Sequence, residues 1–164
     1  TLARQLGAET APFHEVATRA DLDVAIEATG VPAVLKTRRF GYDGKGQAKI
    51  LSRSDADEAW AAMRGQPSIL EGFVTFDREV SVIAARSLDG AFRAFEVTEN
   101  EHRNHILHRS VAPARMGAQA ATEALETARR IAAALDYVGV FAIEYFAVTI
   151  DGREHVYVNE MAPR

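Results

Sequence analysis

VGVFAIEYFAVT (residues 138–149) and EHVYVNEM (residues 154–161) are two apolar runs on either side of the turn residues 151–153. This pattern predicts a β-hairpin, in which residues two apart along a strand share one face. One face of the first strand then carries Glu144 among four apolar residues, which are Val140, Ala142, Phe146 and Val148. On the second strand, Glu160 shares a face with Val156 and Val158.

Matching the apolar residues of the two strands sets the expected register. A three-residue loop, Asp151-Gly152-Arg153, places Val148 opposite Val156 and Glu144 opposite Glu160. Directly opposed like charges repel, and burial disfavours the ionisation of either carboxyl group. The pairing becomes favourable when a hard cation lies between the two groups, since Mg²⁺ binds carboxylate oxygens together with substrate phosphates and waters. We therefore expect a metal site at Glu144 and Glu160.

A two-residue Asp-Gly turn is the alternative for the same hairpin. It slips the register by one residue and moves Glu160 to the other face of the sheet. In the preferred register Asn159 points away from the two carboxylates. Asn159 can join a metal site only if the strand bulges or twists near its end.

The remaining sequence predicts antiparallel hairpins interleaved with a few helices, which indicates an α+β fold rather than a doubly wound sheet. Residues 118–135 show apolar residues at helical spacing. A capping box at Thr18–Asp21 opens a helix that ends near Gly30, and Ser54 is expected to cap another helix. Strands are expected at 31–38, 48–51, 79–86 and 92–97, whereas the polar stretch 100–113 has no assignment.

The composition excludes several classes of protein. With 48% apolar and 26% charged residues among 164, the chain is typical of a globular protein that needs no cross-links. Its formal charge of −4 argues against coating a nucleic acid, and no apolar run is long enough for a membrane span. The absence of cysteine excludes disulfides and thiol catalysis, and it fits a cytoplasmic location. Both ends look like cuts within a longer protein.

Residues Gly41–Gln47, GYDGKGQ, form a glycine-rich connection between two expected strands. Glycines let backbone N–H groups turn toward a bound anion, and Lys45 adds a positive charge there. The run is neither a Walker A loop, since no Ser or Thr follows the lysine, nor a dinucleotide fingerprint, which requires a following helix. A plain hairpin turn at Asp43-Gly44 is the alternative, and a hairpin that covers phosphates satisfies both interpretations.

Three further residue groups are candidates for nucleotide contacts. Lys36 ends a strand before the glycine-rich run, where it can reach a phosphate or simply be solvated. Glu71–Val74 joins the two halves of the chain, and an extended connector can offer backbone groups to an adenine edge. Glu79 can accept ribose hydroxyls, although Glu71 and Glu79 are both also compatible with surface carboxylates on strands.

Histidines recur at every third position as His102, His105 and His108. The flanking Arg103 and Arg109, and the lack of a carboxylate or cysteine at ligand spacing, argue against zinc. An anion-facing basic segment is the preferred interpretation.

Taken in order, these motifs resemble the ATP-grasp superfamily, and most closely its carboxyaminoimidazole ribonucleotide synthases. The resemblance covers essentially the whole chain. It is carried by Leu35-Lys36, Gly41–Gln47, Glu71–Val74, Arg78–Ser81, Asn100–His102, Tyr137–Val140 and Asn159–Arg164. It implies two α+β lobes whose antiparallel sheets enclose the nucleotide, a small lobe over 1–72 and a large lobe over 73–164.

The resemblance also implies a role for each motif. ATP phosphates would be held by Lys36 and by Gly41, Tyr42, Asp43, Gly44, Lys45, Gly46 and Gln47. Adenine would lie against Glu71, Gly72, Phe73 and Val74, with Glu79 on the ribose and His102 on the nucleotide. The metal would be bound by Glu144, Glu160 and Asn159, the last two also contacting the nucleotide. The candidate catalytic residues are Tyr42, Asp43 and Lys45.

The reaction that the resemblance implies uses ATP and Mg²⁺ or Mn²⁺. Bicarbonate is phosphorylated to carboxyphosphate, and the amine of aminoimidazole ribonucleotide is then carboxylated, leaving ADP and phosphate. Positioning and cation neutralisation of the developing charge dominate such a phosphoryl transfer. The small molecules would be the only substrates, and the intact protein would be a cytoplasmic homodimer that binds neither nucleic acid nor membrane.

Two departures and three rivals accompany this resemblance. His105 stands where the family usually has glycine, and the family continues beyond both ends of this chain. We therefore expect this piece to bind nucleotide without turning over. Within the superfamily, the rivals are a formate-dependent glycinamide ribonucleotide transformylase and a biotin carboxylase. A rival from another class is a non-catalytic nucleotide-binding module.

Overall fold

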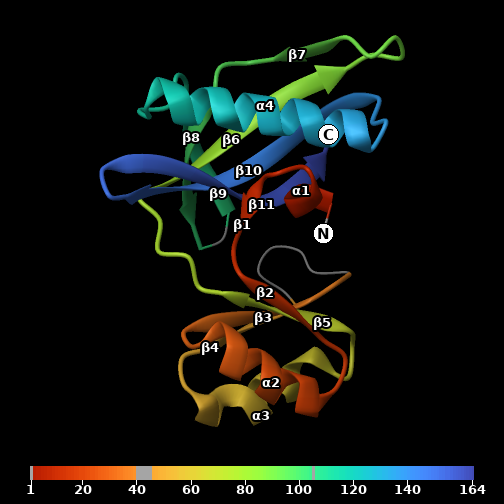
Figure 1. The fold of residues 1–164 in the computed structure, drawn as a ribbon, viewed down its shortest axis with the longest axis vertical. Helices are drawn as coiled ribbons and strands as arrows, with labels where there is room; N and C mark the ends of the chain where they lie inside the picture. The colour runs from red at the N-terminus through yellow and green to blue at the C-terminus, as the bar shows by residue number, and fades with distance from the viewer. Residues whose placement is uncertain (1, 40–45, 105) are drawn as a thin grey trace. The chain divides into compact units, whose positions relative to one another are not determined.

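The computed structural model describes residues 2–39, 46–104 and 106–164, and it divides into two compact units (Figure 1). Ala11–Val74 form one of them, the small unit. The residues through Thr10 join Thr75–Arg164 in the other, the large unit. The expected boundary at 72/73 thus differs from the observed one, above all for the first ten residues. Their strand β1 (Glu9–Thr10) runs parallel to β11 (Arg153–Pro163).

The small unit is an antiparallel sheet with helices on one face (Figure 1). Its strands pair in the order β2-β5-β3-β4, with bounds Phe13–Val16, Ser68–Gly72, Ala33–Thr37 and Gln47–Ile50. The helices are α2 (Arg19–Thr29), the 3-10 helix η1 (Arg53–Asp55) and α3 (Ala56–Met63). Leu35 and Leu70 bury against these helices, so the neighbouring Lys36 and Glu71 lie on the opposite face of the sheet.

Local capping signals set where the helices of the small unit begin. The capping box of α2 is confirmed, because the Thr18 hydroxyl accepts the Asp21 N–H at 3.2 Å and Asp21 accepts the Thr18 N–H at 2.8 Å. The expectation for Ser54 was wrong. Asp55 instead accepts the Ser52 N–H at 2.9 Å in a capping box at η1, which leads directly into α3.

The large unit is built on a longer sheet. Its strands pair in the order β1-β11-β10-β6-β8-β9, with β7 also on β6, and every pairing except β1 with β11 is antiparallel. The remaining bounds are α1 (Leu2–Gln5), β6 (Arg78–Arg86), β7 (Phe92–Ala94), β8 (Thr98–Arg103), β9 (Ile106–Val111), α4 (Ala118–Ala134) and β10 (Gly139–Ile150). The stretch 100–113, which had no assignment, mostly belongs to the β8–β9 hairpin.

Helix α4 covers one face of this sheet (Figure 1). Its small residues, such as Ala124 and Ala128, pack on Val82, Phe141 and Tyr145, all buried. Because side chains alternate along a strand, the residues between these face away from α4. We call that opposite face of the larger sheet the site face; it carries Glu79, Ser81, Asn100, His102, Glu144 and Phe146. Among the described helices, none combines the length and apolar character that crossing a membrane requires.

The turn between β10 and β11 is the two-residue alternative. Ile150 pairs with Arg153, and Asp151 and Gly152 have φ of 50° and 77°, the positive values that an Asp-Gly hairpin turn adopts. The expected three-residue loop was wrong. Tyr145 and Ala147, rather than Phe146 and Val148, face α4.

A β-bulge then restores the carboxylate pairing. The ladder shifts between Glu144 and Tyr145, so that Tyr145 pairs with Val158 while Glu144 pairs with Glu160. Val158 and Met161 both pack on the core, and two residues rather than one lie between them. Asn159 is the extra residue, and both it and Glu160 therefore turn to the site face. The predicted opposition of Glu144 and Glu160 is confirmed, although the turn and register predicted to produce it were wrong.

Tyr145 gives a stability prediction for this core. Its buried hydroxyl donates to the Ala124 carbonyl of α4 at 2.9 Å. Tyr145→Phe is expected to lower the free energy of unfolding by about 1 kcal/mol, the usual contribution of one hydrogen bond. Urea denaturation measures this change. Tyr137→Phe is the control, because its hydroxyl donates to the Val140 carbonyl at the surface, and a larger loss for Tyr137→Phe would contradict the packing described.

Candidate functional site

Two carboxylates meet on the site face of the large unit. Glu144 of β10 is half-buried, Glu160 of β11 is exposed, and the two are strand partners. Burial raises the pKa of the Glu144 carboxyl, and the neighbouring charge of Glu160 raises it further, while His102 and Arg164 act in the opposite direction. Without a ligand, the repulsion between the two carboxylates is therefore only partly offset by the nearby basic side chains.

Glu79 and His102 lie next to this pair. Glu79 of β6 is the strand partner of Phe146 on one side and of Asn100 on the other. The Glu79 carboxylate is hydrogen-bonded to Nδ1 of His102, and both side chains are about one-quarter exposed, at 26% and 24%. The structure thus brings together four residues that sequence reasoning singled out: Glu79, His102, Glu144 and Glu160. The charge of each of the other three affects the pKa of Glu144.

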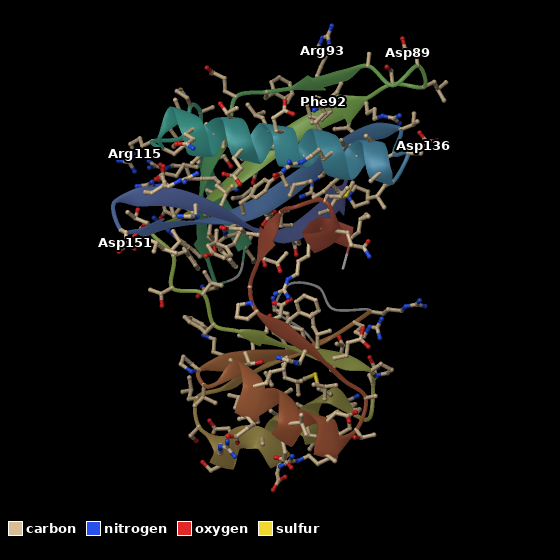
Figure 2. The ribbon with its side chains drawn as sticks, in the orientation of Figure 1. Asp89, Phe92, Arg93, Arg115, Asp136 and Asp151 are labelled. Carbon is tan, nitrogen blue, oxygen red and sulfur yellow. The ribbon has the colours of Figure 1, made fainter. Side chains whose placement is uncertain are left out.

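A cavity of about 360 Å³ opens at one end of this group. Glu79, Asn100 and His102 line it together with Phe76, Arg109 and Arg115. Figure 2 shows Arg115 near the beginning of α4 and Asp151 at the tip of the β10–β11 hairpin, at the same end of the large unit. Phe76 stacks on Phe146 with ring centroids 4.6 Å apart and planes 8° from parallel. Sequence reasoning missed this aromatic pair, since Phe76 lies outside the expected strands.

The small unit holds the other described candidates. The Lys36 ammonium lies 2.6 Å from a carboxylate oxygen of Glu71, across the open face of the sheet. Gln47 is the strand partner of Lys36 and shares that face. The pairing keeps Lys36 at the sheet surface rather than extended into solvent, with 30% of its side chain exposed. A cation held in this way can exchange its carboxylate partner for a phosphate.

The connector Glu71–Val74 has fewer free backbone N–H groups for a ligand than the sequence suggested. The Gly72 N–H donates to the Pro12 carbonyl at 2.8 Å, and the Phe73 N–H donates to the Pro32 carbonyl at 3.1 Å. A side chain at position 72 would also come within 2.8 Å of Pro12, so the close approach requires glycine. A backbone hydrogen bond to adenine at these two residues would therefore use a carbonyl group rather than an N–H group.

Several candidates lie outside the described residues. They are Gly41, Tyr42, Asp43, Gly44 and Lys45 of the glycine-rich run, and His105. Gly46 is described and has φ of 72°, a positive value that favours glycine, and its carbonyl accepts the Thr37 N–H at 2.8 Å. His108 is exposed on β9.

The donor set on the site face fits Mg²⁺ or Mn²⁺ bound together with phosphates. In the described part of the chain, no group of three or more His, Cys, Asp or Glu side chains is placed to hold a metal. Two carboxylates and an amide oxygen are fewer ligands than an all-protein site needs. They suit Mg²⁺, which is commonly bound by one or two carboxylates, with the remaining positions filled by waters and substrate phosphates.

The sequence and the fold of this chain are shared by known proteins. The family model of the ATP-grasp domain matches residues 1–164. The chain therefore belongs to the ATP-grasp family. It is 46% identical over 160 residues to the N5-carboxyaminoimidazole ribonucleotide synthase of Brucella melitensis, covering 96% of this chain and 43% of that protein. The chain thus spans less than half the length of this curated relative.

Solved structures show the same similarity. An N5-carboxyaminoimidazole ribonucleotide synthetase in complex with ADP superposes with a TM-score of 0.89 and 41% identity, covering 99% of this chain and 42% of that one. The Aspergillus clavatus enzyme in complex with ADP and 5-aminoimidazole ribonucleotide gives a TM-score of 0.84 at 28% identity, covering 98% of this chain and 41% of that one. The α+β fold expected from the sequence is confirmed.

Proposed function

We propose that this chain is the ATP-binding part of a ligase that carboxylates 5-aminoimidazole ribonucleotide with bicarbonate, giving N5-carboxyaminoimidazole ribonucleotide, ADP and phosphate. The observation that carries the proposal is the bulge at Asn159. It turns Asn159 and Glu160 toward Glu144 on the face that also holds Glu79 and His102. The proposed reaction is the one for which the similar proteins are named.

Each group of residues has its own proposed role in phosphoryl transfer. Glu144, Glu160 and Asn159 would hold Mg²⁺ or Mn²⁺, which neutralises charge that develops on the phosphates. Glu79 would accept ribose hydroxyls, and its hydrogen bond with His102 fixes the direction of its carboxylate. Lys36 would bind a phosphate in place of Glu71. Of the glycine-rich run, Tyr42, Asp43 and Lys45 keep their proposed role next to the transferred group.

The further proposals concern the whole protein. Its substrates are ATP, bicarbonate and aminoimidazole ribonucleotide, and neither nucleic acid nor membrane is a partner. It works in the cytoplasm as a homodimer. Since the relatives are more than twice as long as this chain, the assay uses the intact protein.

Hydrolysis of ATP by the intact protein tests this function. Phosphate release is expected to depend on both aminoimidazole ribonucleotide and bicarbonate. If formate replaced bicarbonate while glycinamide ribonucleotide served as acceptor, the transformylase would be correct instead. If ATP bound equally well with and without Mg²⁺, the non-catalytic module would be correct.

Lys36→Ala is expected to weaken ATP binding by roughly tenfold, because one charge-assisted hydrogen bond contributes about 1.5–3 kcal/mol. Isothermal titration of the intact protein with ATP and Mg²⁺ measures the dissociation constant. Arg53→Ala is the control, since Arg53 forms an ion pair with Glu27 on the helical side of the same unit. An unchanged ATP affinity in Lys36→Ala would remove Lys36 from the site.

A further inference from the structure

A row of hydrogen bonds crosses the site face and ends opposite Glu144. It begins on β9, where the Ser110 hydroxyl donates to Oδ1 of Asn100 at 2.8 Å. On β8, Nδ2 of Asn100 donates to Oγ of Ser81 on β6. The strand partner of Ser81 on β10 is Glu144. The row therefore runs from an edge strand to the residue that lies opposite one of the two carboxylates of the proposed metal site.

The chemistry of the amide fixes the direction of this row. An amide NH₂ group can only donate, so Oγ of Ser81 accepts from Asn100 and keeps its own proton to donate. Thr98 does not use that proton, because its hydroxyl bonds the Ser81 carbonyl at 3.3 Å. No other residue described in the structure is hydrogen-bonded to the Ser81 hydroxyl. Ser81 is only 5% exposed, so solvent does not readily supply an acceptor.

Glu144 is the acceptor that the topology provides. Directly opposed residues of an antiparallel pair share a face, with Cβ atoms about 4.5–5.5 Å apart. A hydroxyl proton and a carboxylate can meet across that distance after rotation of their side-chain bonds. An ionised carboxylate accepts hydrogen bonds and cannot donate, so the Glu144 carboxylate is chemically matched to the remaining proton of Ser81.

We propose that Ser81, held by Asn100 and Ser110, is a positioning residue that donates its hydroxyl proton to one carboxylate oxygen of Glu144 and so directs the other oxygen toward the cation. This inference rests on the proposed function, in which Glu144 binds the metal. Groups that orient a metal ligand in this way typically change metal affinity by about 10- to 100-fold when removed. Sequence reasoning did not single out this role for Ser81 or Asn100.

Direct binding of Mn²⁺ tests the role without relying on turnover. Electron paramagnetic resonance measures free Mn²⁺ in the presence of the intact protein and saturating ADP. Ser81→Ala is expected to weaken Mn²⁺ binding by roughly tenfold. Asn100→Asp is expected to weaken it as well, because an aspartate at this position accepts the Ser81 proton and draws it away from Glu144. Ser81→Thr retains a hydroxyl and is expected to recover most of the affinity.

Ser68→Ala is the matched control. It removes another buried serine hydroxyl, one that donates to the Gln66 carbonyl at 2.8 Å in the small unit. Its Mn²⁺ affinity is expected to stay within about twofold of the wild type. Mn²⁺ affinity unchanged in both Ser81→Ala and Asn100→Asp would overturn the positioning role. Failure of the proposed function looks different: the wild type would bind Mn²⁺ with ADP but release no phosphate in response to aminoimidazole ribonucleotide and bicarbonate.

Discussion

Glu144→Gln and Glu160→Gln, each introduced into the intact protein, are expected to lower turnover by roughly tenfold or more. Glutamine keeps the size of the side chain but removes the negative charge that the metal requires. The two carboxylates are strand partners, and each raises the electrostatic cost of the other in the metal-free protein. Either substitution relieves that repulsion, so thermal stability is expected to hold or rise while activity falls.

The combination of the two readouts makes this prediction specific. Steady-state phosphate release gives turnover, and a thermal melt without metal gives stability. Glu126→Gln is the control, because Glu126 lies on the surface of α4, where it forms an ion pair with Arg129. Full activity in both Glu144→Gln and Glu160→Gln would overturn the metal assignment. A fall in activity accompanied by an equal loss of stability in each would indicate a structural role instead.

The second large effect is expected at Phe141. This side chain is fully buried beneath α4, with the ring of Tyr137 5.3 Å away edge-on and that of Phe92 at 6.3 Å. Phe141→Ala is expected to lower the free energy of unfolding by about 3–5 kcal/mol, since it loses buried apolar area and leaves a cavity. Domains of this kind are stable by only about 5–15 kcal/mol, so the variant approaches unfolding.

Urea denaturation compares Phe141→Ala with Phe95→Ala. Phe95 is 73% exposed, so its removal is expected to change the free energy of unfolding by less than about 0.5 kcal/mol. Because the chemical change is identical at both positions, the difference between the two unfolding free energies reports the effect of burial. Equal losses for the two variants would mean that α4 does not cover this part of the sheet.

The final hairpin shows how far the sequence determines the site. The alternation of apolar residues correctly predicted two strands, and the opposition of Glu144 to Glu160 is confirmed. The turn was wrong because Asp151-Gly152 favours a two-residue turn with both φ angles positive. The bulge at Asn159 corrects the one-residue register slip that this turn causes. No local sequence pattern predicts the bulge. Both faces of β10 carry apolar residues, so alternation alone cannot say which face meets α4.

In the rest of the chain, the features that were missed in the sequence have other physical causes. The β8–β9 hairpin was missed because β8 is polar and β9 is exposed along its whole length, so neither strand shows hydrophobic alternation. β1 was missed because Glu9–Thr10 gains its partner only from β11, far along the chain. The capping box at Thr18 was found because all of its partners lie within four residues. Long-range hydrogen bonds such as that from Asn100 to Ser81 require the strands to be assembled first.

The most direct measurement of the central claim is the position of Mn²⁺ in crystals of the intact protein grown with ADP, located from its anomalous scattering. An anomalous peak is expected within direct coordination distance of carboxylate oxygens from both Glu144 and Glu160, with ADP phosphate oxygens completing the coordination shell. A Mn²⁺ ion bound elsewhere, with these two carboxylates free of metal while ADP is present, would contradict that claim.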